Sequence, residues 1–296
     1  MEHAIYNASE YTKKAKVQHM YMLKRISPIS LNNNQIFQIA TLIHSKWAKK
    51  DQSVFTRDSR NWQGSTPTPE LYAEQLRQIR EKGCTPIFIL EDEGGRVVGS
   101  LITLRWKGAL PTKYKELVNN DYEGKDWHNG ETLLCRCISV SEEAKGGSRA
   151  LIVDGAAAYA KEEMANGTLR YAIAYSRPSD FGTLAVPNGI GIMEYLKWTV
   201  AKCETKGADS TEQRRFYDAY VAQFGPTGMA DVLRSTGRRH VDQTLGMHLS
   251  YGAEIMAVYE NGCPNDRAAG GYNIMMDYTP MLAGMPGRGI DPAFMR

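Results

Sequence analysis

Several signatures of specialised proteins are absent from this 296-residue sequence. No uninterrupted apolar run approaches the roughly 20 residues of a membrane-spanning helix, and the first residues lack the basic and apolar segments of a signal peptide. The net charge of +3 is too small to favour binding to nucleic acid or to a membrane surface. We therefore expect a cytoplasmic protein with neither kind of partner.

Cysteine is also scarce. The five cysteines are odd in number and include no Cys-x-x-Cys pair, so we expect reduced thiols and no bound metal. Cys135 and Cys137 lie two residues apart in an apparent strand, so their side chains are expected on the same face. There they could line a pocket as small apolar groups. A nucleophilic role is disfavoured because no histidine lies near them in the sequence.

Two common phosphate-binding loops are missing as well. The nucleotide-binding loop Gly-x-x-x-x-Gly-Lys-Ser/Thr has its lysine after the glycines, whereas here the lysine precedes them. The dinucleotide fingerprint needs three spaced glycines, and residues 133–152 offer only an adjacent pair. A nucleotide-binding protein of another fold is therefore disfavoured.

Residues 133–152 nevertheless combine the parts of an anion site. An apolar segment leads to Gly146 and Gly147, which allow a sharp turn. The alanine-rich segment that follows is predicted to be a helix, whose first turn presents unpaired N–H groups and the positive end of the dipole. Lys145 and Arg149 add positive charge. The stretch suits a phosphate or pyrophosphate, although taken alone it is also typical of a plain strand-to-helix connection.

Periodicity predicts a mixed α/β order. Helical spacing follows residues 31–34 and again residues 66–70, and the second helix ends at Gly83. The β-rich runs 86–90 and 97–104 flank a glycine pair, which indicates a hairpin. The remaining predicted elements are a strand at 132–140, a helix at 148–165, a strand at 171–175, helices at 189–201 and around 212–224, and strands at 253–259 and 271–278.

The composition is that of a soluble globular protein, with 42% hydrophobic and 23% charged residues. No repeat and no clear linker divides the chain. We expect an N-terminal arm over residues 1–27, one domain over 28–280 with a polar insertion at 203–241, and an irregular tail over 281–296.

The glycine turn and the element order together resemble the GNAT acyltransferase superfamily. In that superfamily a basic residue, one or two glycines and a small residue follow a strand and open a helix that binds coenzyme A. The resemblance implies an α/β, GNAT-like fold with a mixed central β-sheet, helices on both faces and a C-terminal strand pair. It also implies a coenzyme A thioester, such as acetyl-CoA, as co-substrate, with no metal.

The same resemblance implies the residues that bind the co-substrate. The pantetheine arm would pair with the backbone of Ile138, Ser139 and Val140. The pyrophosphate would lie on the turn formed by Lys145, Gly146, Gly147, Ser148, Arg149 and Ala150.

Residues 242–278 carry a more specific resemblance. His248 comes shortly before Gly252-Ala253, a Cys-Pro-Asn-Asp sequence ends at Asp266, and a strand rich in Gly and Tyr ends in Tyr278. This order is similar to the GNAT-like loading domains of polyketide synthases. Members of that group accept an acyl group from coenzyme A and pass it to the phosphopantetheine thiol of an acyl carrier protein, and some were thought to decarboxylate malonyl groups.

This second resemblance implies two catalytic residues. His248 matches the group's catalytic histidine, and Ser176 stands at the position of its threonine. A neutral imidazole can accept a proton from a thiol or amine, and a hydroxyl can donate to a thioester oxygen as charge develops there. Outside the resemblance, His248 is compatible with a structural residue at the start of a strand, Ser176 with a turn residue, and Arg177 and Asp180 with a local ion pair.

Two departures from the group's pattern bear on the substrate. Cys263 stands where the group has an arginine, the natural partner of a malonyl carboxylate, so malonyl decarboxylation is disfavoured. The polar insertion 203–241 could form a lid or a docking surface. A basic patch there could attract an acidic carrier protein, although a solvated charged face is equally open. The candidates are Arg214, Arg215, Arg234, Arg238 and Arg239.

The sequence therefore predicts an acyltransferase. An acetyl or other short acyl group would pass from coenzyme A to a carrier-protein thiol or to an amine by direct attack. An ordinary GNAT N-acetyltransferase acting on a small-molecule amine is one alternative. A non-catalytic acyl-CoA-binding or regulatory protein is an alternative of another class, because a fold does not by itself name a reaction.

Overall fold

A computed structural model describes residues 21–55, 68–82, 86–112, 129–144, 147–204, 228–236, 241–262 and 266–285, together with residues 218 and 222. The chain divides into two compact units, and the boundary falls inside one strand, between Ile173 and Ala174. No linker in the sequence marks this division. The predicted helix around residues 212–224 lies outside the described residues except for its two single positions.

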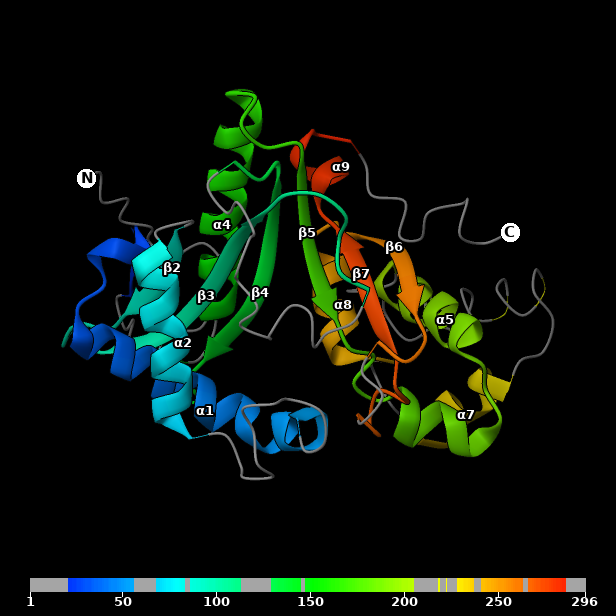
Figure 1. Ribbon diagram of the computed structural model, residues 1–296. Helices are drawn as coiled ribbons and strands as arrows, with labels where there is room; N and C mark the ends of the chain where they lie inside the picture. Colours follow the sequence, from blue (N-terminus) through cyan, green and yellow to red (C-terminus); the bar gives the residue numbers. More distant parts are fainter. Residues whose placement is uncertain are drawn as a thin grey trace. The chain divides into compact units, whose positions relative to one another are not determined.

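The first unit is built on four antiparallel strands in sequential order, β1-β2-β3-β4 (Figure 1). Their bounds are Met22–Ile26 for β1, Ile87–Glu91 for β2, Val97–Trp106 for β3 and Thr132–Val140 for β4. The helices of this unit are α1 (Asn33–Phe55), α2 (Pro69–Lys82) and α4 (Ser148–Ala165), preceded by the short 3-10 helix η2 (Pro28–Ser30). Strand β5 (Tyr171–Ser176) begins here, next to β4 and running in the same direction.

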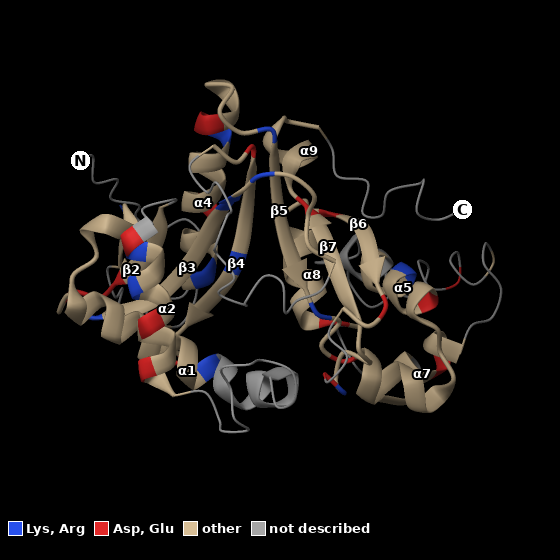
Figure 2. Cartoon of the chain, viewed as in Figure 1, with Lys and Arg blue, Asp and Glu red and all other residues tan. Residues whose placement is uncertain are grey.

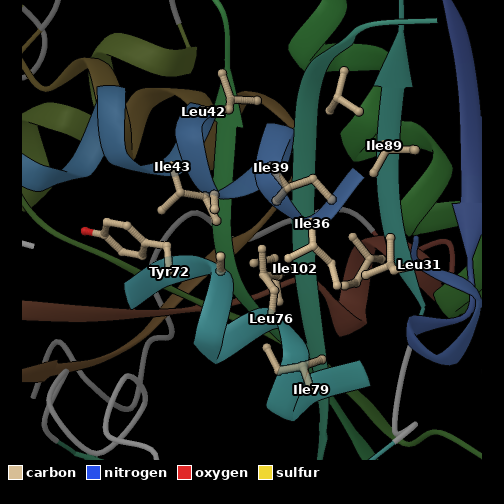
Figure 3. Close-up of a cluster of buried hydrophobic side chains, with 14 residues drawn as sticks. Leu31, Ile36, Ile39, Leu42, Ile43, Tyr72, Leu76, Ile79, Ile89 and Ile102 are labelled. Atoms are coloured by element: carbon tan, nitrogen blue, oxygen red, sulfur yellow. The ribbon is translucent and has the colours of Figure 1, made fainter. Parts of the chain in front are cut away.

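The central strands of this unit are buried on both faces. Ile87 and Ile89 pack into a cluster with residues of α1 and α2, in which Figure 3 labels Ile89. Phe88 and Leu90, which alternate with them along β2, pack into a second cluster with Ile152 of α4. Because successive side chains of a strand point to opposite faces, the continuous apolar run of β2 requires helices on both sides.

Most predicted elements of this unit are confirmed, with small differences in their ends. The hairpin, the strand at 132–140 and the helix at 148–165 are present. Strand β1, by contrast, was not predicted, because residues 1–27 were interpreted as an arm. It carries polar residues in the middle, and Lys24 forms an ion pair with Glu91 of β2. Charged residues on an edge strand hide the period-2 pattern and discourage pairing with other chains.

The second unit contains the end of β5 and a C-terminal strand pair. The strand order is β5-β7-β6, with β6 (Glu254–Tyr259) antiparallel to β7 (Asn273–Asp277). The helical elements of this unit are η3 (Phe181–Ala185), which is a π-helical turn, η4 (Val186–Asn188), α5 (Ile192–Glu204), α7 (Gly228–Thr236), α8 (Gln243–Ser250) and α9 (Thr279–Leu282).

Helices α7 and α8 were not predicted. Helix α8 is short and contains Gly246, a weak helix former, so its propensity is low. It begins because the side chain of Asp242 accepts a hydrogen bond from the backbone N–H of Leu245, which caps the first turn. His248 therefore lies in a helix and not at the start of a strand.

The predicted fold class is confirmed. The strands form a mixed sheet, helices cover both faces of its N-terminal strands, and a strand pair lies at the C-terminal end of the chain. No helix among the described residues is long and apolar enough to cross a membrane.

The close approach of α4 to β3 depends on Gly99, which yields a test of the packing. A Cβ atom at Gly99 would lie 2.6 Å from Cδ1 of the buried Ile152. We expect Gly99→Ala to lower the free energy of unfolding by about 1–3 kcal/mol. Ile152→Val removes that methyl group and should cost about 0.5–1.5 kcal/mol alone. The double variant should lose less than the sum, because the two changes relieve each other.

Chemical denaturation of the four proteins measures these values. Gly94→Ala is the matched control, since a Cβ atom at this exposed turn position would meet only Oδ1 of Asp92, at an ordinary 3.4 Å, and should leave the unfolding midpoint nearly unchanged. Additive losses in the double variant would show that this contact is not tight.

Candidate functional site

Strand β4 contains a β-bulge that separates the two central cysteines. Its pairing with β3 shifts register where Ile102 opposes Cys137 and Thr103 opposes Cys135, so Arg136 has no opposite residue. Cys137 packs against the cluster of α1 and α2, whereas Cys135 packs against the cluster of α4. The prediction that both thiols share a face is therefore wrong, because an extra residue in a strand reverses the alternation.

The surroundings of Cys135 do not favour a nucleophilic role for its thiol. Burial raises its pKa to about 12, because the apolar surroundings disfavour the thiolate. The thiolate is the reactive form of cysteine. Cys135 is thus a packing residue of the α4 face.

The turn after β4 leads directly into the N-terminus of α4. The N–H of Ser141 donates to the carbonyl of Val98, which holds the end of β4 against β3. Gly147 has a φ of 90° and caps the helix without a side-chain hydrogen bond. This left-handed conformation favours glycine. Lys145 and Gly146 lie outside the described residues.

The first turn of α4 is chemically suited to an anion. Ser148, Arg149 and Ala150 form this turn, whose N–H groups have no partner within the helix. No acidic residue lies in this turn. Glu162 and Glu163 lie at the opposite end of α4, where the ribbon of Figure 2 is red. Ser148 is 2% exposed, and its hydroxyl has no hydrogen-bond partner. The turn therefore contains a buried donor that a ligand oxygen would satisfy.

The residues predicted to contact a pantetheine arm lie at the end of β4. Ile138, Ser139 and Val140 pair with Leu101, Ser100 and Gly99 of β3. Their role in binding stays a prediction.

In the second unit, Ser176 ends β5 with an unsatisfied hydroxyl. Its side chain is 3% exposed, and its Oγ atom has no hydrogen-bond partner. The next residue, Arg177, forms an ion pair with Asp266, which precedes β7, and both side chains are largely buried. This partner lies 89 residues away in the sequence, and the local ion pair of Arg177 with Asp180 stays a prediction.

Further contacts hold the segment after Ser176 against the loop before β7. The N–H of Gly182 donates to the carbonyl of Ala268 at 2.7 Å. A Cβ atom at Gly182 would collide with the backbone carbonyl of Arg267, so only glycine fits. The ring of Phe181 meets the ring of Tyr272 edge to face. The carboxyl end of β5 and the amino end of β7 thus lie side by side at one end of these two neighbouring strands.

Asn273 is the first residue of β7 and lies at this same end of the strands. Its side chain is 0% exposed, and neither its Oδ1 nor its Nδ2 has a hydrogen-bond partner. Sequence reasoning did not single out Asn273, and a buried amide has no signature in a single sequence.

His248 lies in the last turn of α8 and is 8% exposed. Its Nδ1 lies 2.7 Å from the phenolic oxygen of Tyr278, which follows β7. When Nδ1–H donates to Tyr278, the ring lone pair is on Nε2, which is the form that a general base needs. The sequence placed Tyr278 at the end of a motif but did not predict this hydrogen bond.

Several predicted features fall outside the described residues. These are Cys263 and most of the polar insertion, including all of the candidate arginines except Arg234. Arg234 lies in α7, which occupies part of the range predicted as the insertion. Among the described residues, no group of three or more His, Cys, Asp or Glu side chains is placed to hold a metal ion.

The sequence matches no established family profile and no curated protein. Solved structures, in contrast, are similar in fold. A GphF GNAT-like decarboxylase in complex with isobutyryl-CoA is 15% identical, with a TM-score of 0.51 over 86% of this chain and 97% of that chain. The loading GNATL domain of CurA from Lyngbya majuscula is 13% identical, with a TM-score of 0.50 over 87% of this chain and 96% of that chain.

Malonyl-CoA decarboxylase from Agrobacterium vitis has a similar fold as well. It is 11% identical, with a TM-score of 0.51 over 92% of this chain and 66% of that chain. These similarities confirm the GNAT-like fold that the glycine turn and the element order predicted.

The raised pKa of the half-buried Cys135 thiol leads to a test by thiol labelling. A pKa of about 12 leaves roughly one thiolate in 10,000 at pH 8. We expect iodoacetamide to leave Cys135 unmodified in the folded protein at pH 8 and to modify it fully in denaturant. Peptide mapping by mass spectrometry measures both. Rapid modification of Cys135 in the folded protein would contradict its placement and reopen a chemical role.

Proposed function

We propose that the protein is an enzyme that acts on an acyl-CoA. It transfers an acetyl or other short acyl group to the thiol of an acyl carrier protein or to an amine. The observation that carries this proposal is the buried, unpaired hydroxyl of Ser176, which belongs to the same unit as the histidine–tyrosine pair of His248 and Tyr278. A hydroxyl left unpaired in the interior costs about 1–3 kcal/mol, so it is typical of a site that a ligand completes.

The first unit supplies residues that fit a coenzyme A thioester. The N–H groups of the first turn of α4 would bind the pyrophosphate, and the unpaired hydroxyl of Ser148 would donate a further hydrogen bond. Lys145 and Gly146 complete this group in the sequence. The strand residues Ile138 to Val140 would pair with the pantetheine amides.

The chemical step needs one base and one hydrogen-bond donor. The acceptor thiol or amine attacks the thioester carbonyl carbon while Nε2 of His248 removes its proton. Ser176 donates to the carbonyl oxygen as negative charge develops there. The carbon–sulfur bond then breaks, coenzyme A leaves as the thiolate, and the proton from His248 neutralises that thiolate. Tyr278 holds the imidazole through Nδ1 during both proton transfers.

Decarboxylation of a malonyl-type acyl-CoA is a second candidate. Two of the structures with a similar fold are named decarboxylases, and the unpaired groups of Ser176 and Asn273 at one sheet edge suit an enolate oxygen. In this reaction the carbon–carbon bond to the carboxylate breaks, carbon dioxide leaves, and the enolate gains a proton. Cys263 at the position of the loading-domain arginine argues against it.

The binding of coenzyme A is tested by a charge reversal in α4. Arg149 is exposed in the first turn, so Arg149→Glu places a negative charge where the pyrophosphate would lie. We expect the Kd for coenzyme A to rise at least about tenfold, because like charges repel there. The same carboxylate favours the helix dipole, so the Tm should not fall.

Isothermal titration calorimetry and thermal unfolding measure the two effects, and Arg149→Gln is the matched neutral control. An unchanged Kd in the glutamate variant would remove α4 from the proposed binding site.

The catalytic roles are tested by separating binding from turnover. The purified protein is first titrated with coenzyme A, acetyl-CoA, malonyl-CoA and a longer acyl-CoA. His248→Ala should abolish turnover, and Ser176→Ala should lower kcat by about 100–1,000-fold, as the loss of one oxyanion donor does. Both variants should keep the Kd for coenzyme A within experimental error.

The products distinguish the candidates. Free coenzyme A released only with a carrier protein or an amine indicates transfer, and carbon dioxide from malonyl-CoA indicates decarboxylation. Binding without turnover in the wild type would leave a non-catalytic acyl-CoA-binding protein. No binding of any acyl-CoA by the folded protein would overturn the proposal.

A further inference from the structure

Asp242 is a buried carboxylate that receives hydrogen bonds from three separate elements. Its side chain is 1% exposed. Oδ1 accepts from the backbone N–H of Leu245 at 2.8 Å, and Oδ2 accepts from the hydroxyl of Tyr195 at 2.8 Å. The hydroxyl of Ser179 and the N–H of Asp180 complete the set at 3.3 and 3.4 Å. Both carboxylate oxygens are thus occupied.

These donors belong to segments that carry the proposed catalytic groups. Leu245 lies three residues before His248 in α8, so the cap fixes the start of the helix that presents the imidazole. Ser179 and Asp180 follow Ser176 by three and four residues, so their bonds fix the chain just after β5. Tyr195 belongs to α5 and packs its ring against Phe181. One side chain therefore joins the segment of Ser176 to the helix of His248.

A helix cap alone does not require this carboxylate. Serine and threonine also cap helices with a single oxygen. A hydroxyl at position 242 could accept from Leu245 but would be too short and too poor in acceptors to hold Tyr195 and residues 179–180 as well. The second oxygen and its donors are thus the part of the site that helix formation leaves unexplained.

We infer that Asp242 is a positioning residue that sets the geometry of Ser176 relative to His248, an inference that rests on the proposed catalytic roles of these two residues. It does not touch the acyl group. It acts through the chain on both sides of the site, and its loss misplaces the hydroxyl donor relative to the imidazole.

The decisive variant is Asp242→Ser, which keeps the cap and removes the other three bonds. A misplacement of about 1 Å costs about 100-fold in rate, so we expect kcat to fall by about that factor. The KM for the acyl-CoA should change less than about twofold, because the binding of the ground state is unaffected. Asp242→Ala also removes the cap, so its Tm should be about 2–4 °C lower than that of Asp242→Ser.

Two further variants separate positioning from folding. Ser179→Ala removes one donor of the β5 segment and leaves the cap and Tyr195 in place, so it should lower kcat by about tenfold without a change in Tm. Asp92→Ser is the matched control, since Asp92 also accepts backbone N–H groups, from Gly94 and Arg96 in the β2–β3 turn. It should leave kcat unchanged.

Amide hydrogen exchange gives a readout that does not require turnover. In Asp242→Ser, residues 177–182 should exchange faster than in the wild type, while residues 245–250 stay protected. If Asp242 only caps α8, neither segment changes and kcat stays at the wild-type value, which would overturn the inference. If Asp242→Ser does not fold, a wild-type kcat in Ser179→Ala overturns it.

Failure of the proposed function has a different signature. A wild type that turns over no acyl-CoA refutes the proposed reaction. In that case hydrogen exchange still tests whether Asp242 holds the two segments together. Unchanged exchange in residues 177–182 would show that it does not.

Discussion

The burial of β2 and β3 on both faces is the constraint on which the first unit depends. Side chains of β2 alternate between the cluster under α1 and α2 and the cluster under α4, so neither face can accept an unpaired charge. Polar chemistry is therefore displaced to the ends of strands and helices. In this unit it gathers where β4 passes into α4 through Gly147, which is where backbone N–H groups remain unpaired.

The same rule applies to the second unit. Among the described residues, the buried side-chain atoms without a partner belong to Ser100, Ser148, Ser176 and Asn273. Two of the four, Ser176 and Asn273, lie at one edge of the second unit's strands, and Ser148 lies at the start of α4. Buried polar groups in folded proteins are nearly always paired. Three of these four residues lie at the ends of elements, whereas Ser100 lies within β3.

The sequence predicted the parts that depend on local patterns. The apolar run of residues 86–90 and the glycine pair that follows it specify the hairpin without reference to the rest of the chain. The β-bulge at Arg136 has no such pattern, and it reversed the expected positions of Cys135 and Cys137. Helix α8 was missed because its eight residues include Gly246, and because its stability comes from the cap by Asp242.

Contacts between distant residues were the least predictable part of the candidate site. The bond between His248 and Tyr278 joins residues 30 positions apart, and the ion pair between Arg177 and Asp266 joins residues 89 apart. The ion pair depends on β5 and β7 being neighbours, and the first bond depends on where α8 lies relative to the end of β7. A single sequence shows neither arrangement. The resemblance supplied His248 and Ser176 as candidates, whereas Tyr278, Asn273 and Asp242 emerge only when the chain is folded.

The energetics of Asp242 argue that it is retained for a site. Burial raises its pKa, and the hydrogen bonds from Leu245 and Tyr195 oppose that rise only in part. Between the ordinary and the raised pKa the folded protein holds a proton that the unfolded chain has released. Stability therefore falls as the pH rises through that range, and the ionised carboxylate costs free energy at every higher pH. A serine cap would avoid this cost, so helix formation alone does not explain an aspartate here. The residue is better understood as a joint between the segments of Ser176 and His248, for which the chain accepts lower stability.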